Sequence, residues 1–293
     1  MGDPCTPGRK APKGNVLALW PFHRVWPQAR PLLELARPAG VMLHGSAEGL
    51  LALAAEYAGK IRDALTYTPD IWLGVGADGD KQAAVERWAA VAKLAKEIGA
   101  ATVQINAEGT PDKQWTGEHA AMVTEAYAAM REEAPGMPLG HTSWYSHVLF
   151  PRYPWAAFIG EGGADYTHPQ VYLPGGSRSG LMARHQKSKA SYAEMRAGRV
   201  RVRDDCDVQI YLEAAQDNDA AGTLTLAPLY DSVCWWAWVR EMDAQGRRSV
   251  VGACLLGRLG YHGAFAIDSF QADHGLTVDG WPGRQTQMAL GLP

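Results

Sequence analysis

The chain lacks the features that would place it in a membrane. No apolar run approaches the eighteen or so uninterrupted residues that a membrane-spanning helix needs. Residues 1–13 are rich in proline, glycine and charge and contain no apolar stretch. We therefore interpret them as a flexible N-terminal arm rather than a signal peptide or an anchor, and we expect no membrane insertion.

Strong charge and paired cysteines are also missing. The sequence holds 28 basic and 31 acidic residues, a formal net charge of -3, so a nucleic-acid partner is not expected. The few cysteines are far apart, without short pairing or metal-ligand spacing: Cys5, Cys206, Cys234 and Cys254. This pattern is typical of free thiols in a protein made in a reducing cytoplasm.

Several catalytic signatures are absent as well. No Gly-x-Gly-x-x-Gly follows the first expected strand, which argues against a dinucleotide site, and no Gly-x-Ser-x-Gly elbow marks a nucleophilic serine. His44, His141 and His168 fall on expected strands. However, there is no His-x-His after the first strand and no lysine on the fourth. We expect neither a metal nor a cofactor.

Residues 14–241 alternate between short apolar runs and longer amphipathic stretches. Amphipathic stripes predict helices around residues 50–57, 85–95 and 122–130, with weaker patterns at 181–197 and 224–230. The apolar runs predict eight strands: 16–20, 41–44, 71–75, 102–106, 139–142, 166–172, 208–212 and 233–238. Strands buried on both faces that alternate with helices indicate a parallel α/β sheet, and eight such units fit a closed (β/α)₈ barrel. A doubly wound open sheet is the alternative.

In such a barrel, the chemistry belongs where the strands end and the following loops begin. Aromatic and carboxylate side chains gather at these positions. Indole rings stack on sugar faces, and carboxylates supply the acid-base chemistry of a glycosidic bond. The candidate site residues are Glu108 and Glu213 for catalysis, and His44, Asn106, His141, Trp144, Gln170, Tyr172, Trp236 and Trp238 for substrate binding.

Glu108 and Glu213 each finish an apolar strand, the fourth and the seventh. This placement resembles the large clan of retaining glycoside hydrolases. The resemblance implies that Glu108 is the proton donor and Glu213 the nucleophile, with Tyr172 as a hydrogen-bond partner of the nucleophile and Trp236 or Trp238 as a sugar platform. It also implies carboxyl groups about 5 to 5.5 Å apart.

One departure from that clan concerns the acid. In the clan an asparagine directly precedes the acid, whereas Ala107 separates Asn106 from Glu108 here. In a strand, this spacing puts Asn106 and Glu108 on one face. Glu161 and Asp165 are competing carboxylates, although the glycines that flank Glu161 are more typical of a turn.

The last thirty residues hold a distinct pattern. Ile267, Phe270 and Gln271 have the i, i+3, i+4 spacing of one helix face, which Gly275 can terminate. Asp279 and Gly280 then predict a tight turn, followed by a last helix with Thr286, Met288 and Leu290.

This pattern resembles the three-helix peptidoglycan-binding domain, over residues 249–293, after a linker at 242–248. The first half is shorter than in the family, because residues 256–261 run almost straight into the Phe-Gln helix. The resemblance implies a wall-binding module that uses Tyr261, Phe270, Gln271, Asp279 and Trp281.

Together these features predict a hydrolase that cleaves the glycan strands of bacterial peptidoglycan. A phage endolysin fits the missing signal peptide, because such proteins are made in the host cytoplasm and reach the cell wall after release. A non-catalytic wall-binding virion or surface protein built on the same barrel is an alternative. Amidase or peptidase chemistry also stays open, since fold alone does not fix the reaction.

Overall fold

The computed structural model describes residues 10–19, 22–52, 59, 61–77, 81–108, 115–171, 178–200, 202–203, 205–213, 220–237 and 244–292. Tyr172 and Trp238, which were predicted to bind substrate, lie outside these residues, and so does the side chain of Glu213.

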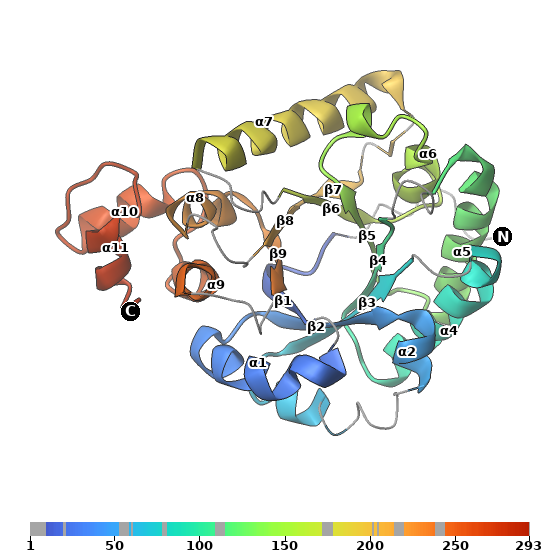
Figure 1. Ribbon diagram of the computed structural model, residues 1–293, viewed down its shortest axis with the longest axis horizontal. Helices are drawn as coiled ribbons and strands as arrows, with labels where there is room; N and C mark the ends of the chain where they lie inside the picture. Colours follow the sequence, from blue (N-terminus) through green and yellow to red (C-terminus); the bar gives the residue numbers. More distant parts are fainter. Residues whose placement is uncertain are drawn as a thin grey trace.

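The strands form a closed barrel in which all neighbours are parallel (Figure 1). The order is β5-β4-β3-β2-β1-β9-β8-β6, and a β5–β6 pairing closes the ring. The strands are β1 (Gly14–Leu19), β2 (Gly40–Ser46), β3 (Asp70–Gly76), β4 (Thr102–Asn106), β5 (Leu139–Trp144), β6 (Tyr166–Gln170), β7 (Asp207–Val208), β8 (Ile210–Glu213) and β9 (Ser232–Ala237). The predicted (β/α)₈ barrel is therefore confirmed, and the open sheet is excluded.

The seventh strand position differs from the prediction because it is divided into β7 and β8. Gln209 lies between them, and its side-chain Oε1 accepts a hydrogen bond from the backbone amide of Ser232 at 3.0 Å. Its Nε2 donates to Asp207 at 2.8 Å. The side chain of Gln209 thus links β7 to the start of β9.

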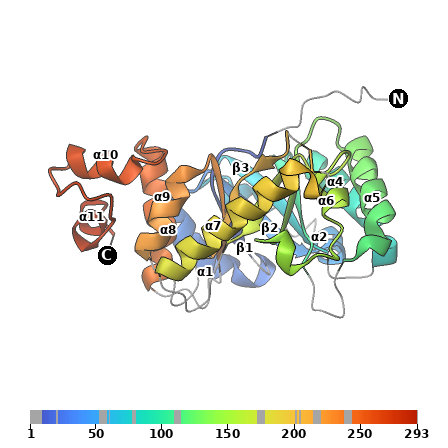
Figure 2. The same ribbon diagram turned by 90° about the horizontal axis from the view of Figure 1, so that it is seen from above.

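Helices surround the barrel, as Figures 1 and 2 show from two sides. They are α1 (Phe22–Ala36), α2 (Ala47–Ala52), α4 (Ala84–Glu97), α5 (Ala120–Glu133), α6 (Trp155–Ile159), α7 (Arg178–Glu194), α8 (Ala220–Leu226) and α9 (Ala244–Arg258). The five helical patterns of the sequence correspond to α2, α4, α5, α7 and α8. α1, α6 and α9 were not anticipated. The polar stretch Ala244–Arg248 in particular carries no apolar stripe that would signal a helix.

The barrel interior is filled by large side chains that need glycines beside them. A Cβ atom at Gly140 would lie 2.3 Å from Cζ of Tyr166, and one at Gly74 would lie 2.5 Å from the sulfur of Met42. Tyr166 and Trp72 are fully buried there, with ring centroids 6.2 Å apart. These rings close the lower half of the barrel, so the interior is a packed core and not a channel.

The C-terminal tail continues from α9 into α10 (Ala266–Asp273) and α11 (Arg284–Ala289). α9 packs against α1, α8 and β1, as the eighth helix of a barrel should. The structure therefore differs from the predicted linker at 242–248: the residues from 244 onward belong to this helix, and residues 249–258 are shared between the barrel and the predicted module. The tail lies at the edge of the molecule beside α8 and α9 (Figure 1).

Within the tail, the predicted turns are present. Gly275 has φ +64 and directly follows the C-cap of α10, and Gly280 has φ +63 in the Asp-Gly turn. Ile267 and Phe270 are buried on one face of α10, as their spacing predicts.

Two further features concern the whole described chain. Cys206, Cys234 and Cys254 are free and buried. Among the described residues, no helix is long and apolar enough to cross a membrane.

Candidate active site

The carboxyl ends of the strands form the mouth of the barrel, where sites of this fold are built. Parts of the loops after β1, β3, β4, β6, β8 and β9 lie outside the described residues. The strand ends themselves and the residues that directly follow them define the site below.

Glu108 lies two residues beyond the end of β4, with its side chain half-buried. The Nε2 atom of Gln170, at the end of β6, donates hydrogen bonds to Glu108 Oε1 and, at 3.3 Å, to Asn106 Oδ1. Asn106 and Glu108 therefore lie on one face, as the intervening Ala107 predicts. The side-chain amide of Gln170 on β6 thus binds the carboxyl group of Glu108, which follows β4.

A second group of side chains lies across the barrel on β2, β8 and β9. The rings of His44 and Trp236 meet edge to face at 5.1 Å, and Tyr211 lies 6.3 Å from Trp236. His44 is 4% exposed, and neither of its ring nitrogens has a hydrogen-bond partner among the described residues. Burial lowers the pKa of His44 to about 3, so its imidazole is neutral at neutral pH and has both a donor and an acceptor to offer.

The layer beneath this group is polar but closed. His168 is fully buried, with Nδ1 3.3 Å from Nε2 of Gln104 and Nε2 3.1 Å from the hydroxyl of Ser232. Burial lowers the pKa of His168 to about 3. Because both nitrogens are partnered by protein groups, this histidine supports the floor of the site.

His141, predicted to bind substrate, lies elsewhere. It is fully buried, its Nε2 is 2.8 Å from the hydroxyl of Tyr153, and its ring packs 4.9 Å from that of Phe158. Phe158 belongs to α6, so His141 occupies the layer between sheet and helix. The prediction that His141 lies at the mouth is therefore wrong. Adjacent residues on β5 face opposite sides of the sheet, and His141 is on the side that faces the helices.

Trp144 ends β5 at the mouth, as predicted. Its ring is stacked on Phe150, with centroids 4.3 Å apart and planes at 12°. Phe150 thereby covers one face of the indole.

The second predicted carboxylate, Glu213, is the last residue of β8, and its backbone pairs with Trp236 of β9. Its separation from Glu108 lies outside the described residues. The competing carboxylates are both at the opposite end of β6. Asp165 precedes that strand, 5% exposed in its side chain and paired with Arg131 at 3.1 Å, while Glu161 is exposed in the preceding turn.

Among the described residues, no group of three or more His, Cys, Asp or Glu side chains could hold a metal ion. Burial raises the pKa of the Cys206 and Cys254 thiols to about 12, and it also raises that of Cys234. None of these three thiols is suited to act as a nucleophile.

Tyr153 lies near the site and carried no signal in the sequence. Burial raises the pKa of its hydroxyl well above the usual value, a hydrogen bond with Ser143 lowers that pKa, and the charge of Glu108 raises it. Ser143 in turn donates to the carbonyl of Ala107 at 3.2 Å. Tyr153 lies in an irregular stretch between β5 and α6, where no periodicity marks a buried residue.

The predicted wall-binding residues divide into two kinds. Phe270 and Gln271 are buried, so they hold the tail together and cannot contact a polymer. Asp279 and Trp281 lie in the Asp-Gly turn, and Tyr261 donates a hydrogen bond to Asp273 at 2.8 Å. These three reach the surface at least in part.

Comparison with known proteins identifies the fold only. No known protein-family profile matches the chain, and no curated protein matches it. The chain is similar to a GH18 chitinase from Pseudoalteromonas aurantia, with a TM-score of 0.57 and 10% identity over 82% of this chain and 99% of the chitinase. A structure from Cytophaga hutchinsonii has a TM-score of 0.52 and 11% identity, over 84% of this chain and 89% of that one.

An N-acetylneuraminate lyase (sialic acid aldolase) from Aliivibrio salmonicida is more distant, with a TM-score of 0.44 and 13% identity over 96% of this chain and 95% of the lyase. At 10% and 11% identity, the likeness to the first two structures shows the (β/α)₈ barrel fold and leaves the reaction open.

Proposed function

We propose that this protein is a glycoside hydrolase that cuts the glycan strands of bacterial peptidoglycan, with Glu108 as the proton donor. The observation that carries the proposal is the Glu108 carboxyl at the barrel mouth, which is bound by Gln170 and follows β4, across the ring of strands from β9 with its Trp236. A GH18 chitinase shares the fold, which is consistent with a glycoside hydrolase on this scaffold.

In the proposed reaction, the sugar polymer lies across the mouth on Trp236, and its leaving oxygen accepts the proton of Glu108. Glu213, at the end of β8, is the proposed nucleophile or the base that activates water. His44 lies beside Trp236 with a neutral imidazole whose two nitrogens are buried without a partner among the described residues. Burial of a polar group without a hydrogen bond is costly, so His44 is proposed to support the Trp236 ring from below and not to bind the sugar directly.

Reducing-end release from purified peptidoglycan tests the proposal directly. Glu108→Gln keeps the shape and the contact with Gln170 but removes the proton, so we expect a loss of about a hundredfold or more. Glu97→Gln, on the exposed last residue of α4, is the matched control and should retain full activity. Wild-type protein that releases no reducing ends from any peptidoglycan, or an active Glu108→Gln variant, overturns the assignment.

The second part of the proposal is that the tail holds the protein on the wall, as an endolysin would need after release. Large apolar side chains are exposed there: Leu259 is 56% exposed, Phe265 75%, Val278 54% and Met288 63%. Exposed apolar groups gathered in one small segment are typical of an interaction surface.

Co-sedimentation of the full chain with purified walls tests this part. Phe265→Ser and Met288→Ser should move the protein toward the supernatant, because each removes exposed apolar area without touching the core. Leu35→Ser, on α1 and 58% exposed, is the control and should pellet like the wild type. Equal pelleting of all variants would show that the tail is not the targeting element.

A further inference from the structure

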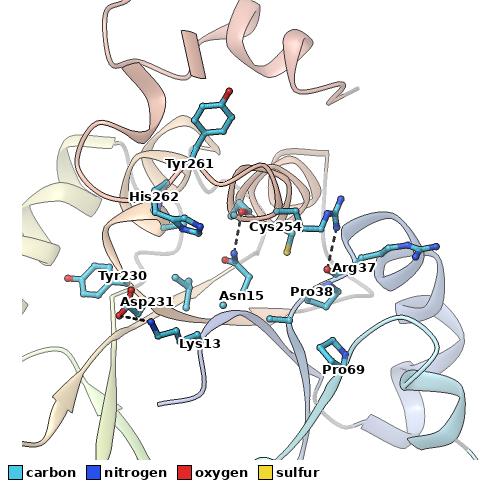
Figure 3. Close-up of a pocket in the computed structure, with 18 residues that line it drawn as sticks. Lys13, Asn15, Arg37, Pro38, Pro69, Tyr230, Asp231, Cys254, Tyr261 and His262 are labelled. Atoms are coloured by element: carbon cyan, nitrogen blue, oxygen red, sulfur yellow. Dashed lines mark hydrogen bonds and ion pairs between the residues drawn. The ribbon is translucent and has the colours of Figure 1, made fainter. Parts of the chain in front are cut away.

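A pocket of ≈ 650 Å³ lies at the amino-terminal end of the barrel, but its charged groups do not converge on the cavity (Figure 3). Lys13 faces Asp231 at 3.9 Å, and the Arg37 side chain points away. The Arg258 guanidinium donates to backbone carbonyls beside the end of α1. Buried polar side chains do converge at the other end of the barrel, behind Glu108.

These side chains lie on the outer face of β5 and β6, which the helices cover. His141 is paired with Thr167 in the register of the two strands, so their side chains lie on the same face. Ser143 follows His141 by two residues and shares that face. All three side chains are fully buried. The outer face of the barrel therefore carries a polar group directly behind the site.

Hydrogen bonds join these side chains in a series. His141 Nδ1 lies 3.0 Å from the hydroxyl of Thr167, and its Nε2 lies 2.8 Å from the hydroxyl of Tyr153. Tyr153 also forms a hydrogen bond with Ser143. The Ser143 hydroxyl donates to the carbonyl of Ala107 at 3.2 Å, directly before the proposed acid. We call this series, from Thr167 to the Ala107 carbonyl, the β5 network.

The direction of each bond in the β5 network follows from its last member. A carbonyl can only accept, so the hydroxyl proton of Ser143 goes to Ala107 and the Ser143 oxygen accepts from Tyr153. The hydroxyl proton of Tyr153 is then used, so His141 Nε2 must donate to the Tyr153 oxygen. Burial lowers the pKa of His141 to about 3, so its ring is neutral and Nδ1 accepts from Thr167. The network therefore requires the Nε2–H tautomer of His141.

The network ends on a peptide group that has a second anchor. The backbone amide of Ala107 donates to the carbonyl of Thr142 at 3.1 Å, although Ala107 lies beyond the end of β4. Together with the Ser143 bond, both backbone polar groups of Ala107 are thus bound to β5. The Ala107 carbonyl belongs to the same planar peptide unit as the amide nitrogen of Glu108. The network therefore fixes the peptide plane from which Glu108 projects, while Gln170 binds its carboxyl.

The surroundings of the network are aromatic and closely packed. The ring of Tyr153 is stacked on Phe158 with centroids 5.0 Å apart, and it lies 4.7 Å from the ring of Trp155. The His141 ring lies 4.9 Å from Phe158. In such surroundings a polar group without a partner is costly, so the loss of one bond should make the others rearrange.

We propose that the β5 network positions Glu108 by holding the Ala107 peptide in place. Ser143 binds this peptide, and Tyr153 and His141 orient the Ser143 hydroxyl. The inference rests on the proposed role of Glu108 as the proton donor. Ser143, Tyr153 and His141 are positioning residues, because they act on Glu108 from the outer face of the sheet.

Nitrogen-15 NMR of the full-length protein tests the direction of the network without reference to activity. We expect the Nε2–H tautomer of His141 in the wild type at neutral pH. In Ser143→Ala, Tyr153 loses its acceptor and should donate to Nε2 instead, so His141 should change to the Nδ1–H tautomer. Hydrogen exchange of the Ala107 amide should accelerate by about tenfold in this variant, the factor that corresponds to one lost hydrogen bond.

Reducing-end release from purified peptidoglycan tests the positioning of Glu108. In Ser143→Ala, kcat should fall by about tenfold with KM unchanged, because a displaced acid impairs the transition state and not substrate binding. Tyr153→Phe keeps the Ser143 bond to the peptide and removes only the group that orients it, so kcat should fall by about threefold.

Tyr127→Phe is the matched control. The Tyr127 hydroxyl is buried on α5 and donates to the carbonyl of Gly140 at 3.2 Å, so this variant also loses one buried hydroxyl bond to a carbonyl of β5. It should keep the wild-type kcat, the His141 tautomer and the exchange rate of the Ala107 amide.

Three results would overturn the inference: an Nδ1–H tautomer of His141 in the wild type, a tautomer and Ala107 exchange rate that do not change in Ser143→Ala, or an equal loss of kcat in Ser143→Ala and Tyr127→Phe. Unchanged kcat in Ser143→Ala would overturn it as well. A wild type that releases no reducing ends refutes the hydrolase proposal alone, and the tautomer and exchange measurements then decide whether the network holds the peptide before Glu108.

Discussion

The tail depends on one buried amide, and its removal has a calculable effect. Gln271 is 2% exposed and has five hydrogen-bond contacts, in which its two N–H groups are shared among three acceptors. Its Nε2 donates to Asp279 Oδ1 at 2.7 Å, to the Trp281 carbonyl at 2.9 Å and to the Thr286 hydroxyl at 3.1 Å. Its Oε1 accepts from the amides of Asp279 at 3.1 Å and Gly280 at 3.0 Å. A single side chain thus joins α10 to the turn and to α11.

Gln271→Ala removes all five bonds. A typical bond contributes about 0.5–1.5 kcal/mol, and partners left unpaired add a desolvation cost. Because several of those partners are partly exposed and can turn to water, we expect about 3 kcal/mol of destabilisation, confined to the tail. At 1.4 kcal/mol per factor of ten, the open state becomes about a hundredfold more populated.

Hydrogen exchange at the Leu290 amide measures this opening. That amide bonds to the carbonyl of Thr286 at 3.0 Å and does not touch Gln271, so faster exchange reports the whole turn of helix rather than one lost acceptor. Gln287→Ala is the matched control, because the side chain of Gln287 donates one hydrogen bond, to the Pro282 carbonyl at 2.9 Å. Unchanged exchange in Gln271→Ala, or equal acceleration in both variants, would refute the reasoning.

Three further predictions concern the barrel. Asp165→Asn should lower stability by about 1–3 kcal/mol in urea unfolding, because the partly buried Arg131 loses its charged partner while Arg203 keeps Asp205; an unchanged stability would contradict this. Gly74→Ala should cost about 1–3 kcal/mol and reduce hydrolysis, because the new Cβ would lie 2.6 Å from His44 Cδ2; full activity would separate His44 from the site. Burial lowers the pKa values of His44, His141 and His168 from 6.5 to about 3, so the unfolded chain takes up protons that the folded chain refuses. The contribution of these histidines to the free energy of unfolding should therefore be complete above pH 6.5 and should fall toward pH 3, by about 1.4 kcal/mol per pH unit for each histidine. In His141→Gln, the pH dependence of the free energy of unfolding should correspond to one proton fewer taken up on unfolding.

The fold was predictable because its strands are short, apolar and regularly spaced. A parallel strand that is buried on both faces needs apolar residues at consecutive positions, and Leu17, Ala18 and Leu19 on β1 show such a run directly. α9 was not predictable, since its first turns are polar and its apolar residues begin only at Val250.

The sequence predicted which residues lie at the strand ends, but not which way their side chains face. Glu108 follows β4 and Gln170 ends β6, the two strands on either side of β5, so both residues were predictable at the same end of the barrel. His141 was misplaced because a strand end does not show which face a side chain takes, and a one-residue shift reverses the face. The contact of Tyr153 with this region depends on an irregular stretch between β5 and α6, which has no pattern to follow.

The positions of the two proposed surfaces constrain how the protein would work on a wall. α9 begins beside the barrel mouth and ends at the amino-terminal face, where the Gly263–Pro228 bond anchors the tail. The tail thus leaves the barrel at the end opposite to Glu108, at least roughly 20 Å away along the strands. A glycan strand held by the tail could not enter the mouth without passing around α8 or α9. The tail would therefore hold one part of the polymer network while the mouth cuts another, and variants of Phe265 should lower the rate on intact walls much more than on short soluble fragments.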